Sequence, residues 1–337
     1  YFKYDQKVYE NLHNLRAKIL KSEDLQTNAD EISSLEREIT LFHASVVTKI
    51  LDSFDKNIDF IGFHGQTIYH NSLEKISKQI GDGNLLSQLT KKTVIYNFRQ
   101  NDIKNDGEGA PLAPVFHKLI VEQKKIELPV CILNIGGIAN VTVINEYYKN
   151  SFISRDLGPG NCLIDEWIRI NTKNNFDNNG AIAKKGRTND LILNQALDNF
   201  DNRQNKKTSS FDTKDFSLSF VRGLNLEDGT STLTDFTVRI IETELLDFLS
   251  ETRERLWKIL ICGGGRKNLT LIERIKSRMF KNFTIQIIDD YGIDGDYVES
   301  QAFAYLAIRS YLGLPISFPN TTGCKKPTTG GKLVKNY

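Results

Sequence analysis

The sequence predicts an α/β protein built from two α/β halves. Amphipathic helices and buried strands alternate along most of its 337 residues, which is the pattern of α/β folds. With 39% hydrophobic and 26% charged residues, the chain has enough apolar side chains for a sizeable core. Three glycine-bearing turns each follow a predicted strand, and ligand sites of α/β proteins gather at strand ends.

The charge balance excludes a strongly basic protein. There are 44 Lys and Arg against 42 Asp and Glu, a net charge of +2, so no whole-molecule field attracts nucleic acid or anionic membranes. Apolar runs such as 259–262 fall far short of the roughly 20 residues of a membrane span. The four cysteines, which include no CxxC pair, indicate buried free thiols: Cys131, Cys162, Cys262 and Cys324. We expect a cytoplasmic protein with no nucleic-acid or membrane partner.

Elements of the first half follow from apolar spacing. Apolar residues three and four apart predict a long helix over about 29–52. The strand 59–63 follows at once and leads into the polar turn 64–67. Further expected elements are a strand at 93–98, a helix at 113–121, a strand at 130–135 and a partner strand at 141–144 across a Gly-Gly turn.

The second half continues the alternation. We expect helices at 162–171, 230–250, 269–280 and 298–312, and strands at 257–262 and 283–288. The Asn/Lys/Asp-rich stretch 171–215 has weak periodicity and is interpreted as a surface excursion. The predicted domains are an N-terminal lobe, 1–130, which lacks its first strands, and a C-terminal lobe, 131–337, which carries the excursion.

Two of the glycine turns are candidates for holding phosphate oxygens. Gly136-Gly137 could let backbone N–H groups approach an anion closely, although an ordinary hairpin turn is equally compatible. The string Asp156-Leu157-Gly158-Pro159-Gly160-Asn161 places a carboxylate at a strand end and a rigid turn before a helix N-terminus, which attracts phosphate. Asp156 could act as a base, hold Mg²⁺ through water or merely cap a turn. Because two glycines and a proline restrict this turn to one backbone geometry, a functional role is favoured over a simple turn cap.

The third turn, Gly263-Gly264-Gly265, follows a buried strand and precedes a helix. Three consecutive glycines are costly in chain entropy unless something flat packs against the backbone, and adenosine is a reasonable occupant. Asn268 stands where a GxGxxG fingerprint needs its last glycine, so dinucleotide binding is disfavoured. The Walker A pattern is also absent from the sequence.

Polar side chains at other strand ends are candidates for one pocket wall. They are His64, Gln66 and Thr67 after one strand, Arg99 and Asp102 after the next, and Glu299 at the start of the last long helix. Each has an alternative interpretation: a lone His is often a satisfied structural residue, and a Glu favours a helix start electrostatically.

Six strings stand in a fixed order along the chain: Gly62-Phe63-His64-Gly65-Gln66-Thr67, Gly109-Ala110-Pro111-Leu112, Leu133-Asn134-Ile135-Gly136-Gly137, Asp156-Leu157-Gly158-Pro159-Gly160-Asn161, Cys262-Gly263-Gly264-Gly265 and Glu299-Ser300-Gln301-Ala302-Phe303-Ala304. In content and order they resemble the anhydro-N-acetylmuramic acid kinase family. The tail is similar too, with Gly313-Leu314-Pro315, Thr321-Thr322-Gly323 and Gly330-Gly331. The resemblance covers essentially the whole chain.

The resemblance implies a two-lobed fold of the actin, Hsp70 and hexokinase type, which is ribonuclease H-like, with a central cleft for ATP and Mg²⁺. The family's reaction opens the 1,6-anhydro ring of anhydro-N-acetylmuramic acid with water and phosphorylates O6. The products are N-acetylmuramate 6-phosphate and ADP, in peptidoglycan recycling. Family members are often dimers, so the resemblance also implies a homodimer.

Individual roles carry over by resemblance. Asp156 resembles the general base that takes a proton from the attacking water. The implied sugar-binding residues are His64, Gly65, Gln66, Thr67, Arg99, Asp102 and Glu299. The implied phosphate-binding residues are Gly136, Gly137, Gly158, Gly160 and Asn161, and those facing adenosine are Gly263, Gly264, Gly265 and Asn268.

The chain departs from the family pattern at two places. Family members begin with a strand and a Ser-Gly-Thr-Ser-x-Asp-Gly loop that grips ATP phosphates, and this chain starts at Tyr1, beyond that loop, so we expect a missing N-terminus. The run Lys206–Asp212 matches the family's Lys-Ser-Thr-Gly-Arg-Glu only loosely. One alternative is therefore a catalytically silent relative that binds sugar or nucleotide. An ATPase with a protein partner is a further alternative, weakened by the string His64-Gly65-Gln66-Thr67.

Overall fold

The computed structural model describes residues 2–145, 152–204, 211–250, 256–279, 281 and 283–337. They form two compact units: the first unit is Tyr1–Phe116 with Ser300–Tyr337, and the second unit is His117–Glu299. The predicted α/β class and the two α/β halves are confirmed. Within the described ranges, no helix combines the length and apolarity needed to cross a membrane.

The unit boundaries differ from the predicted domains 1–130 and 131–337. The C-terminal residues from Ser300 onward belong to the first unit. The physical reason is a short strand, β10 (Lys332–Val334), which pairs antiparallel with β4 (Thr93–Tyr96). Three residues of strand carry no periodicity that a sequence pattern could reveal.

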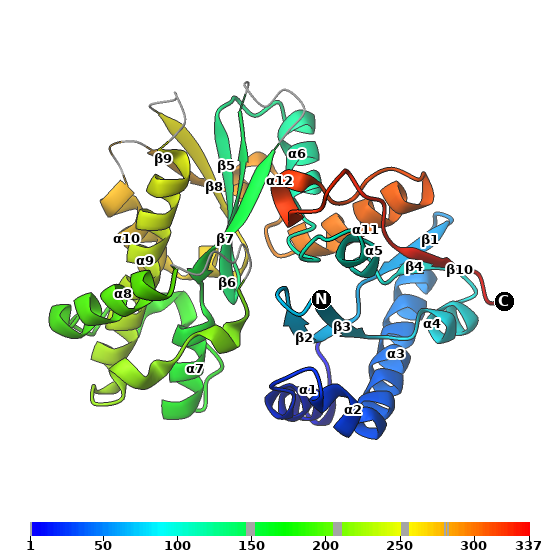
Figure 1. Cartoon of the computed structure of the whole chain (residues 1–337), viewed down its shortest axis with the longest axis horizontal. Helices are drawn as coiled ribbons and strands as arrows, with labels where there is room; N and C mark the ends of the chain where they lie inside the picture. The colour runs from blue at the N-terminus through cyan, green and yellow to red at the C-terminus, as the bar shows by residue number, and fades with distance from the viewer. Residues whose placement is uncertain (1, 146–151, 205–210, 251–255, 280, 282) are drawn as a thin grey trace. The chain divides into compact units, whose positions relative to one another are not determined.

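The first unit contains a three-stranded sheet, a hairpin and several helices (Figure 1). In the sheet, β1 (Phe60–Phe63) runs parallel to β4, with β10 on the other side. The hairpin joins β2 (Gln66–Asn71) and β3 (Ile76–Ile80). The helices are α1 (Gln6–Lys18), α2 (Asp24–Thr27), α3 (Ala29–Asp52), α4 (Gly83–Thr90), α5 (Gln100–Lys104) and α12 (Pro319–Thr322). Two further helices, α6 (Pro114–Gln123) and α11 (Val298–Tyr311), span the unit boundaries.

Helix α3 confirms the predicted bounds 29–52, because its apolar stripe is long and regular. Ile32, Leu35 and Ile39 from that stripe are buried in a cluster with residues of α1 and the hairpin β2–β3. Sequence reasoning missed α1, in which only Val8 and Leu15 are buried. A helix with so few apolar positions depends on packing rather than on its own pattern.

The second unit is built on a five-stranded sheet in the order β7-β6-β5-β8-β9. Strands β5, β6 and β7 are antiparallel to one another in sequence order, and β8 and β9 run parallel to β5. The strands are β5 (Val130–Ile135), β6 (Ile138–Ile144), β7 (Ile153–Pro159), β8 (Trp257–Cys262) and β9 (Phe283–Ile287). The predicted strands at 130–135, 141–144, 257–262 and 283–288 are thus confirmed, with β6 starting earlier.

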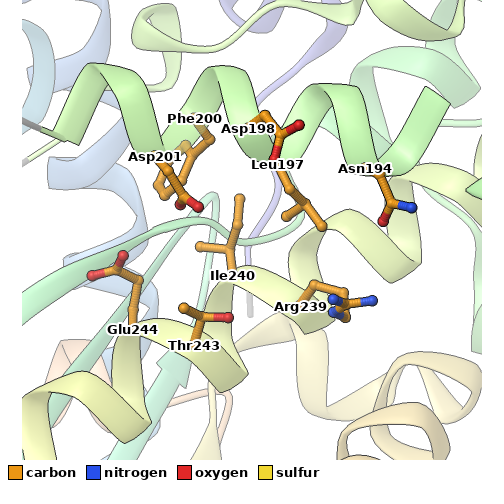
Figure 2. A pocket seen from close by; sticks show the side chains of 9 residues that line it. All are labelled: Asn194, Leu197, Asp198, Phe200, Asp201, Arg239, Ile240, Thr243 and Glu244. Atoms are coloured by element: carbon orange, nitrogen blue, oxygen red, sulfur yellow. The ribbon is translucent and has the colours of Figure 1, made fainter. Parts of the chain in front are cut away.

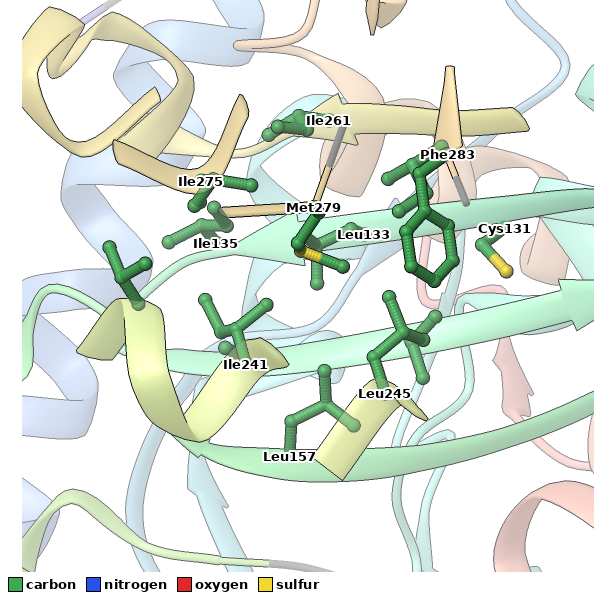
Figure 3. Packing of buried hydrophobic residues seen from close by; sticks show 14 of the residues in the cluster. Cys131, Leu133, Ile135, Leu157, Ile241, Leu245, Ile261, Ile275, Met279 and Phe283 are labelled. Atoms are coloured by element: carbon green, nitrogen blue, oxygen red, sulfur yellow. The ribbon is translucent and has the colours of Figure 1, made fainter. Parts of the chain in front are cut away.

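Two helices, α9 (Leu226–Leu249) and α10 (Leu269–Met279), supply side chains to the core of the second unit. In Figure 3, Leu133 of β5 and Ile261 of β8 lie in one apolar cluster with Leu245 of α9 and Met279 of α10. Each fully buried aliphatic side chain stabilises the fold by roughly 1.5–3 kcal/mol. This core fixes the ends of β5 and β8, where the glycine turns begin.

The stretch 171–215 is more ordered than a surface excursion. It contains α8 (Asp190–Gln204), whose Leu193, Ala196 and Phe200 are buried in a cluster with side chains of α9 and of α7 (Cys162–Asn171). Its other apolar residues, Leu191, Ile192 and Leu197, and its many Asn, Asp and Gln residues are interspersed with these three, so the amphipathic pattern of the helix is weak. Short 3-10 helices occupy Asn178–Gly180, Thr213–Asp215, Leu218–Val221, Gly264–Lys267 and Ile288–Tyr291.

Candidate functional site

The second unit brings the three predicted glycine turns into direct contact. The N–H of Gly160 donates to the Gly137 carbonyl at 2.9 Å, and the N–H of Asn161 donates to the Gly136 carbonyl at 2.8 Å. A Cβ atom on Gly265 would lie 2.4 Å from the Ile135 side chain. The turns that follow β5, β7 and β8 therefore form one packed cluster at one edge of the sheet, which we call the glycine platform.

The platform differs from the expected phosphate cradle in one respect. The N–H groups of Gly160, Asn161 and Cys162 all donate to carbonyls of the β5–β6 turn. They hold the platform together instead of pointing at a ligand. Gly158 also has a packing role, because a Cβ atom there would lie 2.7 Å from the Ile240 side chain of α9.

Other glycines of the platform leave room above the backbone. A Cβ atom on Gly264 would meet no atom within 4 Å, and one on Gly137 would meet nothing closer than 3.4 Å.

Gly263 has a φ of +79°, and a Cβ atom there would lie 2.4 Å from the Asn134 side chain, so only glycine fits. Asn268 is buried and accepts the Leu271 N–H at 3.0 Å, as a cap of α10.

A buried arginine, which sequence reasoning missed, braces the third turn. Arg266 Nε donates to Asp289 at 2.8 Å, and its Nη1 donates to Asp296 at 2.8 Å and to the Gly263 carbonyl at 3.1 Å. The hydrogen bond from Arg266 lowers the pKa of the Asp296 carboxyl. Such charge-assisted bonds hold the backbone of Gly263–Arg266 in a fixed conformation.

Asp156 lies on β7, opposite Asn140 of β6 and just upstream of the platform. It is half-buried, and its Oδ2 accepts the backbone N–H of Phe211 at 2.8 Å. This bond fixes the orientation of the carboxylate. The Phe211 amide is a contact that the sequence did not reveal. Residues 205–210, which include most of the loosely matched run Lys206–Asp212, lie outside the described residues.

In the first unit, His64 and Arg99 form a connected pair. Arg99 Nε donates to His64 Nε2 at 3.1 Å, and its Nη1 donates to the Gly109 carbonyl at 2.7 Å. Because a guanidinium only donates, the proton of the neutral His64 ring sits on Nδ1, which donates to the Gly65 carbonyl at 3.0 Å. Burial, together with the charge of Arg99, lowers the pKa of His64 to about 3. His64 is therefore neutral, with both ring nitrogens engaged by protein groups.

The buried histidines should make stability depend on pH. Burial lowers the pKa of His117 to about 4, just as it lowers the pKa of His64. Below pH 6.5 the unfolded chain binds the protons first, so stability is lost as pH falls, by roughly 2 kcal/mol per histidine between pH 7 and pH 5. Urea midpoints at both pH values measure this loss. His64→Gln should reduce the loss; a loss in that variant equal to that of wild type would contradict the assignment.

Asp102 is fully buried and does not face outward as a pocket wall would. One carboxylate oxygen accepts the Gly109 N–H at 2.7 Å, and the other accepts the Thr322 hydroxyl at 2.7 Å. Asp102 therefore links two segments: the loop at Gly109, whose carbonyl accepts from Arg99, and the C-terminal helix α12. Its contacts indicate a positioning role rather than contact with a ligand.

The remaining predicted residues lie on the hairpin and on α11. Gln66 Nε2 donates to the Tyr4 hydroxyl at 2.9 Å, and Thr67 Oγ1 accepts from Gln79 at 3.2 Å. Gly65, with a φ of +74°, allows no Cβ atom, which would lie 2.3 Å from the Ile80 carbonyl. Glu299 is exposed in the first turn of α11 and is the last residue of the second unit.

Each unit contains a hollow of its own. In the first unit a cavity of about 440 Å³ includes His64 in its wall. In the second unit a pocket of about 190 Å³ lies between α8 and α9 (Figure 2), away from the predicted site residues. Its acidic side chains, Asp198, Asp201 and Glu244, outnumber its one cation, Arg239, so it disfavours an anionic ligand.

Comparisons with known proteins show which family the chain is similar to. The sequence model of the family described as anhydro-N-acetylmuramic acid kinase matches residues 3–336. The anhydro-N-acetylmuramic acid kinase of Pelagibacter ubique is 58% identical over 337 residues, covering 100% of this chain and 90% of the relative. That of Zymomonas mobilis is 39% identical over 306 residues, covering 90% and 81%.

Among solved structures, the activator of the 2-hydroxyisocaproyl-CoA dehydratase from Clostridium difficile, with bound ADPNP, is 14% identical. The match covers 56% of this chain and 65% of the activator, with a TM-score of 0.31. A likeness at this level does not indicate a shared function.

Proposed function

Because the chain belongs to the anhydro-N-acetylmuramic acid kinase family, we propose that its second unit holds ATP and the catalytic base and that its first unit recognises the sugar. The activity is that of the family: ATP-dependent phosphorylation of anhydro-N-acetylmuramic acid. The two α/β units agree with the two-lobed fold that the resemblance implies. A catalytically silent relative is not favoured, since the 58% identity extends over the whole chain.

Asp156 is the proposed general base, and the observation that carries the proposal is its fixed carboxylate beside the glycine platform. The carboxylate takes a proton from water as the water oxygen bonds to the anomeric carbon and the bond from that carbon to O6 breaks. O6 then forms a bond to the γ-phosphorus while the bond to the ADP oxygen breaks. Base catalysis and alignment are the two contributions that such a reaction needs from the protein.

The glycine platform is the proposed nucleotide site. Its internal hydrogen bonds make it rigid, and the open space above Gly137 and Gly264 leaves backbone accessible to phosphates and adenosine. Gly136, Gly160, Asn161 and Asn268 shape the platform through contacts within the protein. A rigid backbone surface loses little entropy when the ligand binds.

Mg²⁺ is proposed to accompany ATP. The described residues include no group of three or more His, Cys, Asp or Glu side chains placed to hold a metal ion. This arrangement is compatible with a metal ion that is held mainly by nucleotide phosphates and water, with at most one or two carboxylates of the protein. Asp156 is the carboxylate nearest the platform in the sequence. When bound, the ion neutralises phosphate charge.

Sugar recognition is proposed to involve Arg99, Gln66 and Thr67 of the first unit, together with Glu299, the last residue of the second unit. His64 and Asp102 position Arg99 from behind, through His64 Nε2 and through the Gly109 loop. A guanidinium bonded to protein acceptors in this way has a fixed orientation. We also propose a cytoplasmic homodimer, which light scattering of the purified protein tests for oligomeric state.

The function itself is tested by incubating the protein with ATP, Mg²⁺ and anhydro-N-acetylmuramic acid. The expected products are ADP and N-acetylmuramate 6-phosphate in equal amounts, measured by a coupled ADP assay and mass spectrometry. ATP hydrolysis without a phosphorylated sugar would contradict sugar phosphorylation.

Gly264→Val should raise the KM for ATP about tenfold and leave the fold intact. The added side chain meets no protein atom within 4 Å, so it would occupy the space assigned to adenosine. Gly223→Val is the matched control, because Gly223 is also free of neighbours within 4 Å and lies outside the platform. Steady-state kinetics with varied ATP measure the effect, and a normal KM for ATP in Gly264→Val would place adenosine elsewhere.

A further inference from the structure

The cavity of the first unit adjoins the proposed sugar-binding residues. Its volume is about 440 Å³, and its wall includes His64, residues of β3, and Gln100 at the start of α5. Pockets of this size hold small ligands or their substituents. Two residues of the wall are hydrogen-bonded to residues assigned to the sugar: His64 to Arg99, and Gln79 to Thr67.

Two lysines and one carboxylate lie in the wall of this cavity: Lys75, Lys78 and Glu36. Asp106, the partner of Lys75, is shared with Lys325, and the hydrogen bonds from the two lysines lower the pKa of the Asp106 carboxyl to about 2. The single negative charge of Asp106 is therefore shared by two ammonium groups, and one of their two positive charges is not neutralised.

The other lysine of the wall, Lys78, lies near a carboxylate but is not hydrogen-bonded to it. Lys78 Nζ lies 3.9 Å from Glu36 Oε1, which is beyond hydrogen-bond distance. The same Glu36 oxygen accepts the Gly81 N–H at 3.0 Å. The Lys78 ammonium is therefore held near the cavity by weak attraction, and an anionic group in the cavity would bind it more closely.

Polar groups of the wall are already ordered around these cations. Gln100 Nε2 donates to the Ser77 carbonyl at 2.6 Å, and Gln79 Nε2 donates to the Ser77 hydroxyl at 2.7 Å. Ser77 is buried and bridges the hairpin to α5. The cavity therefore has a pre-ordered polar wall, which lowers the entropic cost of binding a charged group.

We propose that this cavity receives the lactyl carboxylate of the sugar and that Lys78 is the residue that binds it. The inference rests on the proposed function, because muramic acid is the 3-O-lactyl ether of glucosamine and the carboxylate is the single charge of its N-acetylated anhydro form. Lys78 then distinguishes anhydro-N-acetylmuramic acid from 1,6-anhydro-N-acetylglucosamine, which lacks that group. The carboxylate gains a charge-assisted hydrogen bond from Lys78 that the other sugar cannot make.

Lys78→Met should raise the KM for anhydro-N-acetylmuramic acid at least tenfold and leave the KM for ATP unchanged. Binding of 1,6-anhydro-N-acetylglucosamine, measured by calorimetry, should not change. Lys78→Arg keeps the charge and should keep the KM within about threefold of wild type. Lys56→Met, at an exposed lysine of the same unit outside the cavity, is the matched control and should behave as wild type.

Different outcomes separate the inference from the function on which it rests. An unchanged KM for the muramyl sugar in Lys78→Met overturns the assignment of Lys78. A raised KM for ATP instead would mean that the cavity takes phosphate, and this also overturns it. If wild type makes no ADP with the sugar, the proposed function fails, and calorimetry with anhydro-N-acetylmuramic acid still tests the cavity: weaker binding by Lys78→Met supports it, and equal or absent binding overturns it.

Discussion

Asp156→Asn is expected to lower kcat about 10³-fold, within the range by which a positioned general base accelerates a reaction. Asparagine has nearly the same shape, and its carbonyl oxygen can still accept the Phe211 N–H that Asp156 Oδ2 accepts. The variant should therefore keep its fold and its affinity for ATP, while the amide no longer takes a proton from water. Steady-state ADP release and ATP titration by calorimetry measure the two quantities separately.

A matched control for this variant is Asp198→Asn, which removes an exposed carboxylate of the same unit on α8. It should turn over at the wild-type rate, which excludes a general effect of the lost charge. If Asp156→Asn kept more than about a tenth of the wild-type kcat, another group would have to take the proton. A loss of ATP binding in Asp156→Asn would instead assign the carboxylate to the nucleotide or its metal.

Regular, well-buried elements were predictable from the sequence. Strand β5 is buried at five of its six positions and α3 carries a continuous apolar stripe, so local pattern and tertiary environment agree. The hairpin β2–β3 and α8 were missed. The hairpin strands are short, the apolar residues of α8 are interspersed with many polar ones, and both elements gain their burial from partners elsewhere in the chain. The order of β10 beside β4 depends on contacts more than 200 residues apart in the chain, which no local pattern records.

Within the candidate site, sequence reasoning found the residue types but not their partners. It placed His64 and Asp102 in a pocket wall. His64 does line the cavity of the first unit, but both His64 nitrogens and both Asp102 oxygens are engaged by protein groups. Thr322, one of those partners, lies 220 residues from Asp102. A side chain's role depends on whether its polar atoms are already satisfied, and that information is three-dimensional.

Gly160→Ala is expected to destabilise the second unit by about 3 kcal/mol and to abolish ATP binding, because a methyl group there has no room. Its Cβ atom would lie 2.4 Å from the Gly136 carbonyl oxygen, so the β5–β6 turn must move and the hydrogen bonds that join the glycine turns must lengthen or break. Urea unfolding and ATP calorimetry measure both effects. Gly264→Ala adds the same methyl group to the same platform where no atom lies within 4 Å, so its stability should equal that of wild type. Equal stability of the two variants would mean that the turns are not joined as the hydrogen bonds indicate, and the platform could not then be the rigid surface proposed for ATP.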